Sequence, residues 1–287
     1  MTEHPGVPPD GIVLVGTPIG NLGDLTPRAV EVLRAADAVF CEDTRRTRAL
    51  LSAAGVPAPR LVALHRHNEA AGAARAVQLA AGGALVALVT DAGMPGVSDP
   101  GERVVRAAVA AGVPVTAAPG PSAATVAVAL SGLDVGRWCF EGFLPRKGSE
   151  RGARLAAVSA DERPSVIFEA PARVAATLGD LSESCGPERA VVLARELTKR
   201  HEEVWRGPIS AAVGLAVVGD ARGEWVIVVD GAPPRTVDDG AIVAALEERI
   251  SAGSDRRSAV ADVARSLGLS RRRVYELSHG GARDADR

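Results

Sequence analysis

The sequence predicts an α/β protein built from two α/β domains and a small helical C-terminal module. Short apolar segments typical of strands alternate with longer amphipathic or alanine-rich segments from residue 11 to about 231, which is the order expected of α/β domains. The run at 84–90 is apolar throughout, as in a strand with both faces covered. Turn residues at 119–121 and 233–240 interrupt the alternation, so we place the domains at residues 1–120, 121–233 and 234–287.

The first domain is predicted to contain a largely parallel sheet. Thr26 and Pro27 form a helix start, with Thr26 as the N-cap and Pro27 at the first helical position. Gly82 and Gly83 end the next helix. The predicted strands are 12–15, 38–41, 84–90 and 113–116, and the predicted helices are 27–36, 69–81 and 102–111.

The second domain is predicted to follow the break at Pro119-Gly120-Pro121. Ser122 is placed as the N-cap of a helix that runs to about Ser131. Further strands are expected at 165–168, 190–193 and 224–229, with a helix at 172–181; helices at 241–250, 256–267 and 270–277 form the C-terminal module. The last two helices, with a turn at Gly268, resemble a helix-turn-helix.

Composition excludes several classes of protein. The apolar runs are too short to cross a bilayer, so no membrane segment is expected, and the N-terminus lacks the pattern of a secretion signal. Three cysteines lie far apart, which fits a reducing cytoplasm better than a disulfide framework or a zinc site. The formal net charge of −2 argues against a globally basic nucleic-acid-binding protein but allows a local basic face.

Three glycine-rich turns follow predicted strands, at the edge of the sheet where α/β proteins usually bind ligands. They span residues 16–25, 91–101 and 118–124. Pro18 lacks an amide donor, so the first turn does not suit a phosphate cradle. The second turn carries two carboxylates, and the third places small side chains at a helix start. Spacing alone identifies no ligand for these turns.

Eight motifs occur in a characteristic order. They are GTPIGNLGDLTPRA, CEDTRRT, HRHNE, DAGMPGVSDPG, PGPSAA, EGFLPRKG, ARELTKRHEEVWRG and GEWVIVVDG. This order resembles the ribosomal RNA small-subunit methyltransferase I family of the tetrapyrrole methylase superfamily, over about residues 11–231. The resemblance implies two α/β domains of tetrapyrrole methylase type with a cleft for S-adenosyl-L-methionine between them. It also implies a cytoplasmic homodimer that methylates the 2′-hydroxyl of a cytidine in the decoding region of 16S ribosomal RNA, in free RNA or in the small ribosomal subunit.

The same resemblance implies a set of cofactor-binding residues. The first domain contributes Pro18, Asp91, Gly93, Met94, Pro95, Ser122 and Ala123, and the second contributes Phe168, Glu169, Ala170, Glu196, Leu197 and Glu224. Two positions depart from the family pattern: Met94 stands where a threonine is expected, and Ala172 stands where a histidine is expected. We expect the turns near residues 16, 91 and 120 to converge on one crevice for this cofactor.

Two segments are candidates for the catalytic groups. Glu42, Asp43 and Arg45 follow a strand, beside Arg46; a carboxylate could orient the ribose hydroxyl while arginine holds the RNA backbone. A solvated ion-pair cluster with a helix cap is the alternative. His65 and His67 occupy alternate positions of a segment taken as extended, where a neutral imidazole could accept the proton. Surface-exposed structural histidines are the alternative, and metal binding has weak support, so no metal site is predicted.

Two basic segments are candidates for RNA binding. Arg146 and Lys147 lie beside Trp138, Phe140 and Phe143, a mixture that suits backbone contact with stacking; a core-facing aromatic edge beside a solvated loop is the alternative. In the tail, Ser270 caps a helix whose first turn contains Arg271, Arg272 and Arg273. Residues 251–287 hold eight arginines and five acidic residues, which suggests docking to RNA; the alternative is a purely structural helical cap.

Two other functions fit parts of the sequence. One is a methyltransferase of the same superfamily with a tetrapyrrole or protein substrate. The other is a non-catalytic, ligand-sensing regulator that binds DNA through the helix-turn-helix. The basic tail and the CEDTRRT and EGFLPRKG motifs favour RNA over a macrocycle.

Overall fold

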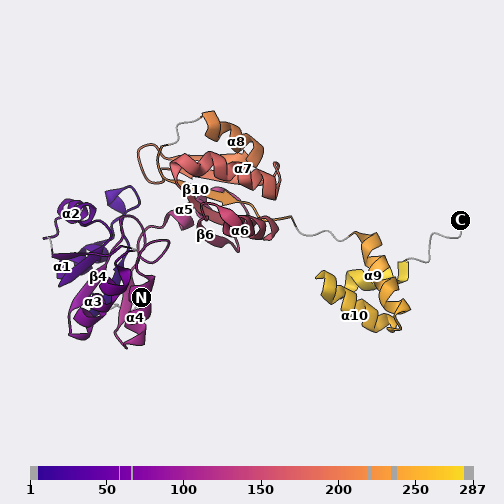
Figure 1. The fold of residues 1–287 in the computed structure, drawn as a ribbon, viewed down its shortest axis with the longest axis horizontal. Coiled ribbons are helices and arrows are strands. Elements are labelled where there is room, and N and C mark those ends of the chain that lie inside the picture. Colours follow the sequence, from indigo (N-terminus) through magenta and orange to yellow (C-terminus); the bar gives the residue numbers. More distant parts are fainter. Residues whose placement is uncertain (1–5, 58, 66, 219–221, 234–237, 281–287) are drawn as a thin grey trace. The chain divides into compact units, whose positions relative to one another are not determined.

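The computed structural model describes residues 6–57, 59–65, 67–218, 222–233 and 238–280 (Figure 1). The chain divides into two compact units, residues 1–232 and residues 233–287. The larger unit contains two five-stranded sheets, and the described part of the smaller unit is helical. Among the described residues, no helix combines the length and the apolar character needed to cross a bilayer.

The first sheet is parallel, with the strand order β3-β2-β4-β1-β5. The strands are β1 (Gly11–Val15), β2 (Ala38–Cys41), β3 (Arg60–Ala63), β4 (Leu85–Leu88) and β5 (Val115–Ala118). Because β4, β1 and β5 are neighbours, the turns that follow them leave the same edge of the sheet side by side. This order brings together the three glycine-rich turns.

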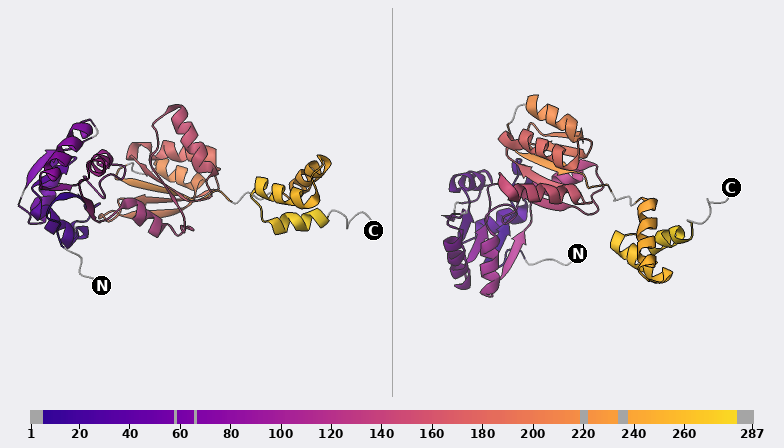
Figure 2. Two further views of the ribbon diagram at one scale, coloured as in Figure 1. Left: turned by 90° about the horizontal axis from the view of Figure 1, so that it is seen from below. Right: turned by 45° about the vertical axis from the view of Figure 1, so that its right-hand side comes forward.

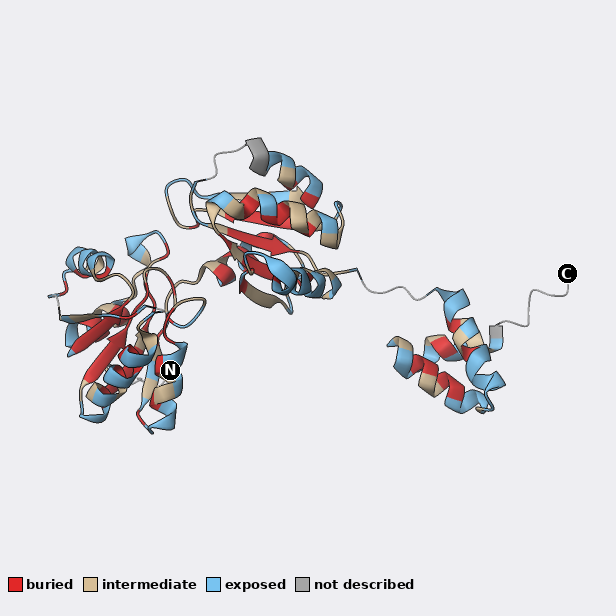
Figure 3. Cartoon of the chain, viewed as in Figure 1, coloured by how far each residue is buried: buried red, intermediate tan, exposed pale blue. Residues whose placement is uncertain are grey.

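Helices cover both faces of the first sheet (Figure 2). On one face, α1 (Pro27–Ala35) and α2 (Thr44–Ala53) pack over residues that include Val13 and Val39. On the other, α3 (Glu69–Ala81) and α4 (Glu102–Ala110) pack over residues that include Phe40 and Leu88. The inner strands β1, β2 and β4 are buried on both sides, as the apolar run at 84–90 predicts for β4, whereas the edge strands β3 and β5 are partly exposed (Figure 3).

The second sheet is mixed, with the order β6-β7-β10-β8-β9, in which only the β6–β7 pair is parallel. Its face formed by residues such as Val166 and Val228 is covered by α5 (Ala123–Ser131), and the opposite face by α6 (Gly148–Ala160), α7 (Val174–Cys185) and α8 (Ile209–Val218). The strands are β6 (Cys139–Phe143), β7 (Ser165–Glu169), β8 (Ala190–Arg195), β9 (Glu203–Pro208) and β10 (Trp225–Val229), and short 3-10 turns occur at Leu22–Asp24 and Pro171–Arg173.

The smaller unit, yellow in Figure 1, consists of three helices around a core of its own. They are α9 (Asp239–Ser251), α10 (Arg256–Leu267) and α11 (Arg271–Gly280). Gly268 ends α10 with a left-handed backbone at φ 67°, and the buried Ile242, Val263 and Val274 bring the three helices together. The helix-turn-helix pattern of the sequence is thus confirmed as a folded unit.

The predicted fold class is confirmed, with differences in the elements. Thr26 caps α1 as predicted, because its hydroxyl accepts a hydrogen bond from the amide of Ala29 at 3.1 Å. Ser122 stands at the N-cap position of α5, but its side chain makes no capping hydrogen bond. The elements α2, β3, β6, α6, β9 and α8 were not predicted. Residues 234–237 of the predicted linker at 233–240 lie outside the described residues, and the boundary near residue 120 stays a proposal.

Candidate functional site

Three turns at the carboxyl edge of the first sheet meet in space. Thr17, after β1, and Gly93, after β4, exchange backbone hydrogen bonds of 2.9 and 3.1 Å. The Thr17 hydroxyl donates to the carbonyl of Thr90 at 3.1 Å. The third turn, after β5, approaches the first at Gly16 and Gly120. The predicted convergence of these turns is therefore confirmed.

Glycine is required where the first and third turns touch. A Cβ atom on Gly16 would lie 2.5 Å from the amide nitrogen of Gly120 and 2.8 Å from the sulfur of Met94. A Cβ atom on Gly120 would lie 2.9 Å from the Cα of Gly16. Gly93 has φ of +83°, a region that favours glycine. Any side chain at residue 16 or 120 would push the two backbones apart.

A cavity of about 330 Å³ lies beside the three turns. This volume falls at the lower end of the roughly 300–1,000 Å³ typical of small-ligand pockets. Its lining comes from both halves of the larger unit. The residues are Ile19, Arg46, Thr90, Asp91, Ala92, Gly93, Met94, Val97, Ser98, Asp99, Ser122, Ala123, Phe143, Phe168, Glu169, Ala170, Pro171, Leu197, Glu224, Trp225 and Val226.

Aromatic side chains form part of the wall that the second sheet provides. The ring of Phe168 lies 5.0 Å from that of Phe140 and 5.8 Å from that of Phe143, both in edge-on arrangements. Phe140 packs in the core, as does Trp138, whereas Phe143 is 52% exposed at the cavity. The core-facing alternative is thus correct for two of these aromatics. Phe168, Phe143 and Trp225 give the cavity an apolar wall that suits a flat ring.

The carboxylate of Glu169 points into the protein rather than the cavity. It accepts hydrogen bonds from the Thr177 hydroxyl at 2.6 Å and from the amide of Ala170 at 2.8 Å, and it lies 3.4 Å from the Arg173 guanidinium. Glu169 is only 2% exposed. Its place in the cavity wall therefore reflects its backbone, while its charge is balanced by internal partners.

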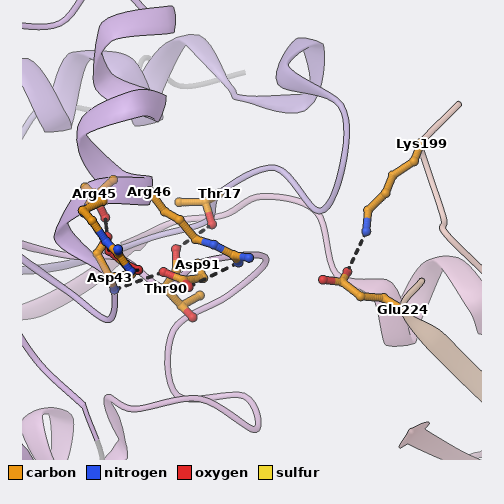
Figure 4. A network of polar contacts seen from close by, with 9 residues as sticks. Thr17, Asp43, Arg45, Arg46, Thr90, Asp91, Lys199 and Glu224 are labelled. Carbon is orange, nitrogen blue, oxygen red and sulfur yellow. Dashed lines mark hydrogen bonds and ion pairs between the residues drawn. The ribbon is translucent and has the colours of Figure 1, made fainter. Parts of the chain in front are cut away.

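Asp91 joins two neighbouring turns (Figure 4). One carboxylate oxygen accepts a hydrogen bond from the amide of Asp43 at 3.1 Å, and the other lies 3.3 Å from the Arg46 guanidinium. The Asp91 side chain is 22% exposed and that of Arg46 is 66% exposed. Asp91 thus fixes the start of α2 and holds an exposed cation at the cavity wall.

Asp43 is the N-cap of α2. Its carboxylate accepts hydrogen bonds from the side chain of Arg45 at 2.9 Å and from the Arg45 amide at 2.8 Å, and these contacts lower the pKa of Asp43 to about 2. A general base works best with a pKa near the working pH, so Asp43 is a poor proton acceptor. The helix-cap interpretation is confirmed for Asp43. Glu42, half-buried beside it, is outside the cavity lining.

Thr90, which the sequence analysis did not select, is buried at the cavity. Thr90 is only 3% exposed, and its hydroxyl oxygen has no hydrogen-bond partner among the described residues. An unsatisfied buried hydroxyl destabilises a protein by about 1–3 kcal/mol. A ligand that forms a hydrogen bond here would remove that penalty. No sequence pattern distinguishes such a threonine from an ordinary strand residue.

Backbone strain also marks this site. Within the described part of the chain, the non-glycine residues with positive φ are Ser98, Glu196 and Thr198, at 63°, 50° and 65°. Ser98 lines the cavity, and the other two flank Leu197, which also lines it. Such strain often accompanies function. This backbone conformation depends on the folded turns, so it cannot be predicted from the sequence.

Glu196 supports the cavity wall from behind. Its carboxylate accepts hydrogen bonds from the Lys199 ammonium and from the amide of Glu224, each at 2.8 Å. The hydrogen bond from Lys199 lowers the pKa of Glu196. Lys199 also lies 3.0 Å from the carboxylate of Glu224 (Figure 4). One lysine therefore joins two acidic residues.

The structure brings most of the predicted cofactor residues to one cavity. Three do not line it: Pro18 borders an adjoining hollow, Pro95 is buried, and Glu196 supports the wall. Arg46, predicted for RNA, does line it. The predicted residues in the lining are Asp91, Gly93, Met94, Ser122, Ala123, Phe168, Glu169, Ala170, Leu197 and Glu224.

The two candidate histidines lie elsewhere. His65 and His67 are exposed after β3, with ring centroids 6.0 Å apart, and neither lines the cavity. The expected extended segment is wrong, because the amide of His65 donates to the Asn68 side chain at 2.8 Å and closes a turn that contains His67. Arg66, between them, lies outside the described residues. In the described residues, no group of three or more His, Cys, Asp or Glu is arranged to hold a metal.

Arg146 and Lys147 are exposed just before α6. The residues before them are anchored: the Arg151 guanidinium donates to the carbonyl of Pro145 at 2.9 Å, and the Arg173 guanidinium donates to that of Leu144 at 3.1 Å. Arg151 is 9% exposed. The two basic side chains therefore extend from a backbone segment that hydrogen bonds hold in place.

The three arginines predicted for RNA in the smaller unit divide into two groups. Arg271 and Arg272 border a shallow hollow of about 570 Å³ with Arg256, Arg257, Val260, Ala261, Tyr275 and His279. Arg273 instead pairs with Asp239 at 2.9 Å, and its amide donates to the predicted cap Ser270 at 3.3 Å. Tyr275 is 56% exposed beside the arginines.

The two sheets and the cavity at the carboxyl edge of the first one define an α/β protein that binds a small ligand. The chain belongs to the tetrapyrrole (corrin/porphyrin) methylase family, whose model matches residues 11–213. Within that family the chain is similar to ribosomal RNA small subunit methyltransferase I of Synechocystis sp., with 39% identity over 93% of this chain and 96% of that protein. The resemblance inferred from the motifs is confirmed.

Solved structures share the fold. The methyltransferase CobJ aligns with a TM-score of 0.59 at 23% identity, over 80% of this chain and 97% of that chain. Uroporphyrin-III C-methyltransferase from Thermus thermophilus, complexed with S-adenyl homocysteine, aligns with a TM-score of 0.55 at 19% identity, over 76% of this chain and 96% of that one. At these identities the likeness establishes the fold alone.

Proposed function

We propose that this chain uses S-adenosylmethionine to methylate the 2′-hydroxyl of a cytidine in the decoding region of 16S ribosomal RNA. The observation that carries the proposal is the cavity where three turns converge, in a chain 39% identical over 93% of its length to a protein named for small-subunit ribosomal RNA methylation. A fold neighbour was solved with S-adenyl homocysteine, the product form of this cofactor. The proposal includes a cytoplasmic homodimer.

The cavity wall suits the cofactor chemically. Phe168, Met94 and Ile19 offer apolar surface for a purine ring. The Thr90 hydroxyl lacks a partner and can bond a polar group of the nucleoside. The first turn of α5 has no side-chain cap, which leaves its amides to bind a carboxylate. Together these features match a ligand with a flat base, hydroxyl groups and an amino-acid end.

The chain's own residues provide alignment and electrostatics. When bound, S-adenosylmethionine would supply an electrophilic methyl group for transfer to the ribose hydroxyl oxygen, leaving S-adenosylhomocysteine, and the hydroxyl proton would pass to a base or to water. Asp91 and Asp43 position the start of α2, which places Arg46 at the cavity wall. The positive charge of Arg46 favours the ionised form of a nearby hydroxyl. Because Asp43 remains ionised and engaged with Arg45, we assign it to positioning.

Two exposed basic regions support an RNA substrate. Arg146 and Lys147 lie on the larger unit, and Arg271 and Arg272 lie in the basic hollow of the smaller unit. Arginines beside an exposed tyrosine are typical of surfaces that bind unpaired nucleotides. We assign both regions to RNA docking.

The test uses the full chain, isotopically labelled S-adenosylmethionine and small ribosomal subunits that lack the modification. We expect one methyl group per subunit, recovered as 2′-O-methylcytidine after digestion to nucleosides and mass spectrometry. Calorimetry with S-adenosylhomocysteine measures cofactor binding independently of the substrate. Cofactor binding without transfer to the subunit or to its free RNA would overturn the RNA substrate, and absence of cofactor binding would overturn the methyltransferase assignment.

A further inference from the structure

A second hollow adjoins the cavity on the side of α2. It measures about 500 Å³ and lies between the turn after β1 and the exposed side of α2. Three residues line both spaces: Arg46, Thr90 and Asp91. We call this space the α2 pocket; beyond the shared residues, its lining includes Pro18, Leu22, Leu50 and Ala53. The two spaces are thus neighbours across one polar wall.

A methyl acceptor needs a space of this kind. The cavity of about 330 Å³ is sized for one small ligand. A cofactor that occupies it leaves little room for a nucleotide beside it. In-line displacement also requires the attacking oxygen to approach the methyl carbon from the side opposite the leaving sulfur. The acceptor must therefore occupy a neighbouring space that opens onto the cavity.

The lining of the α2 pocket matches an unpaired nucleotide. Leu22, 59% exposed, Leu50 and Pro18 offer apolar surface against which a base can pack. Arg46 lies at the shared wall, so a cation that can bind phosphate borders the apolar floor. Enzymes that modify a nucleotide within folded RNA move it out of its stack into such a pocket.

A buried polar group lies where the two spaces meet. The Thr90 hydroxyl is unpartnered in the described chain, and its residue is only 3% exposed. Arg46, by contrast, is mostly exposed and bound to Asp91 by a single ion pair at 3.3 Å, so it can turn toward either space. The shared wall therefore presents a buried hydroxyl, which can bond the cofactor on one side, and the exposed cation of Arg46, which can bond a nucleotide on the other.

We propose that the α2 pocket holds the target nucleotide, turned out of the RNA, with its ribose at the shared wall beside Arg46. The inference rests on the proposed function and extends it, because it assigns the substrate site to α2. The same assignment gives a purpose to the CEDTRRT motif: Asp43 and Asp91 fix the helix, and its next turns receive the nucleotide.

Filling the pocket tests this assignment. Ala53, in the last turn of α2, lines the pocket and is exposed, so Ala53→Trp places an indole in it without disturbing the core. Ser52 is its exposed neighbour outside the lining, so Ser52→Trp is the matched control. The full-length proteins are compared by single-turnover methyl transfer to small ribosomal subunits and by calorimetry with S-adenosylhomocysteine.

We expect Ala53→Trp to slow transfer by about 100-fold, the effect of displacing a reactant from its productive position, while S-adenosylhomocysteine affinity stays within about twofold. Ser52→Trp should match the wild type in both assays. Transfer by Ala53→Trp at the wild-type rate would overturn the inference, as would equal losses in both variants. If the wild type binds S-adenosylhomocysteine but does not methylate the subunit, the proposed RNA substrate fails first, which separates the two outcomes.

Discussion

Removal of the unpartnered hydroxyl of Thr90 should stabilise the folded protein but weaken its binding of the cofactor. Burial of a hydroxyl without a partner destabilises the ligand-free protein by about 1–3 kcal/mol. Valine keeps the branched shape and removes the hydroxyl. Thr90→Val should therefore raise the free energy of unfolding by about 1 kcal/mol, which corresponds to a Tm increase of roughly 2–4 °C for a unit of this size.

The same substitution should weaken cofactor binding. Loss of one hydrogen bond of about 0.5–1.5 kcal/mol raises the Kd for S-adenosylhomocysteine by about 2- to 12-fold. Differential scanning calorimetry and isothermal titration measure the two effects. Thr177→Val is the matched control, since this buried hydroxyl donates to Glu169 at 2.6 Å and its loss should lower Tm. A lower Tm for Thr90→Val, or an unchanged Kd, would refute the reasoning.

Three further changes test other features. Gly16→Ala should destabilise the larger unit by about 1–3 kcal/mol and weaken S-adenosylhomocysteine binding, because its Cβ would lie 2.5 Å from the facing backbone; Gly152→Ala, with open space around it, should not destabilise in thermal unfolding. Arg271→Gln should lower the salt-dependence slope of RNA binding by about 1, whereas Arg265→Gln, outside the basic hollow, should leave it unchanged in fluorescence anisotropy. The pKa of Asp43 is lowered from 3.8 to about 2, so the ionised carboxylate stabilises the fold above pH 3.8, and this contribution disappears as the pH falls through 2. Thermal melts of Asp43→Asn should therefore show a smaller loss of stability between about pH 4 and pH 2 than those of the wild type. An identical loss would count against the ion pair with Arg45.

The sequence predicts the strongly patterned elements well. The bounds of β2, α3 and α10 match their predicted ranges, because each has clear apolar periodicity or a defined end such as Gly82. The missed α2 begins with five polar residues, and the acidic residue at its N-cap could equally have been a catalytic group from the sequence alone. The missed β9 is only partly buried, so it lacks a continuous apolar signal.

Some features of the candidate site could likewise be predicted from the sequence, and others could not. The turns after β1, β4 and β5 could be selected because glycine and proline mark them, and strand order brings them together. The orphaned hydroxyl of Thr90 and the strained backbone of Glu196 could not, because both arise from packing between distant segments. Glu169 shows the opposite error: its carboxylate was predicted to bind the cofactor, but in the fold it binds Thr177 and Arg173.

The anchoring of the segment before α6 has a thermodynamic consequence. Buried Arg151 and half-buried Arg173 restrain the carbonyls of Pro145 and Leu144, so the backbone beneath Arg146 and Lys147 gives up its conformational freedom during folding. A polyanion that meets these two cations then has only their side chains to order, at about 2 kcal/mol or less each. Association at this surface should accordingly be rapid and weakly dependent on temperature, in contrast to recognition by a loop that folds only on contact.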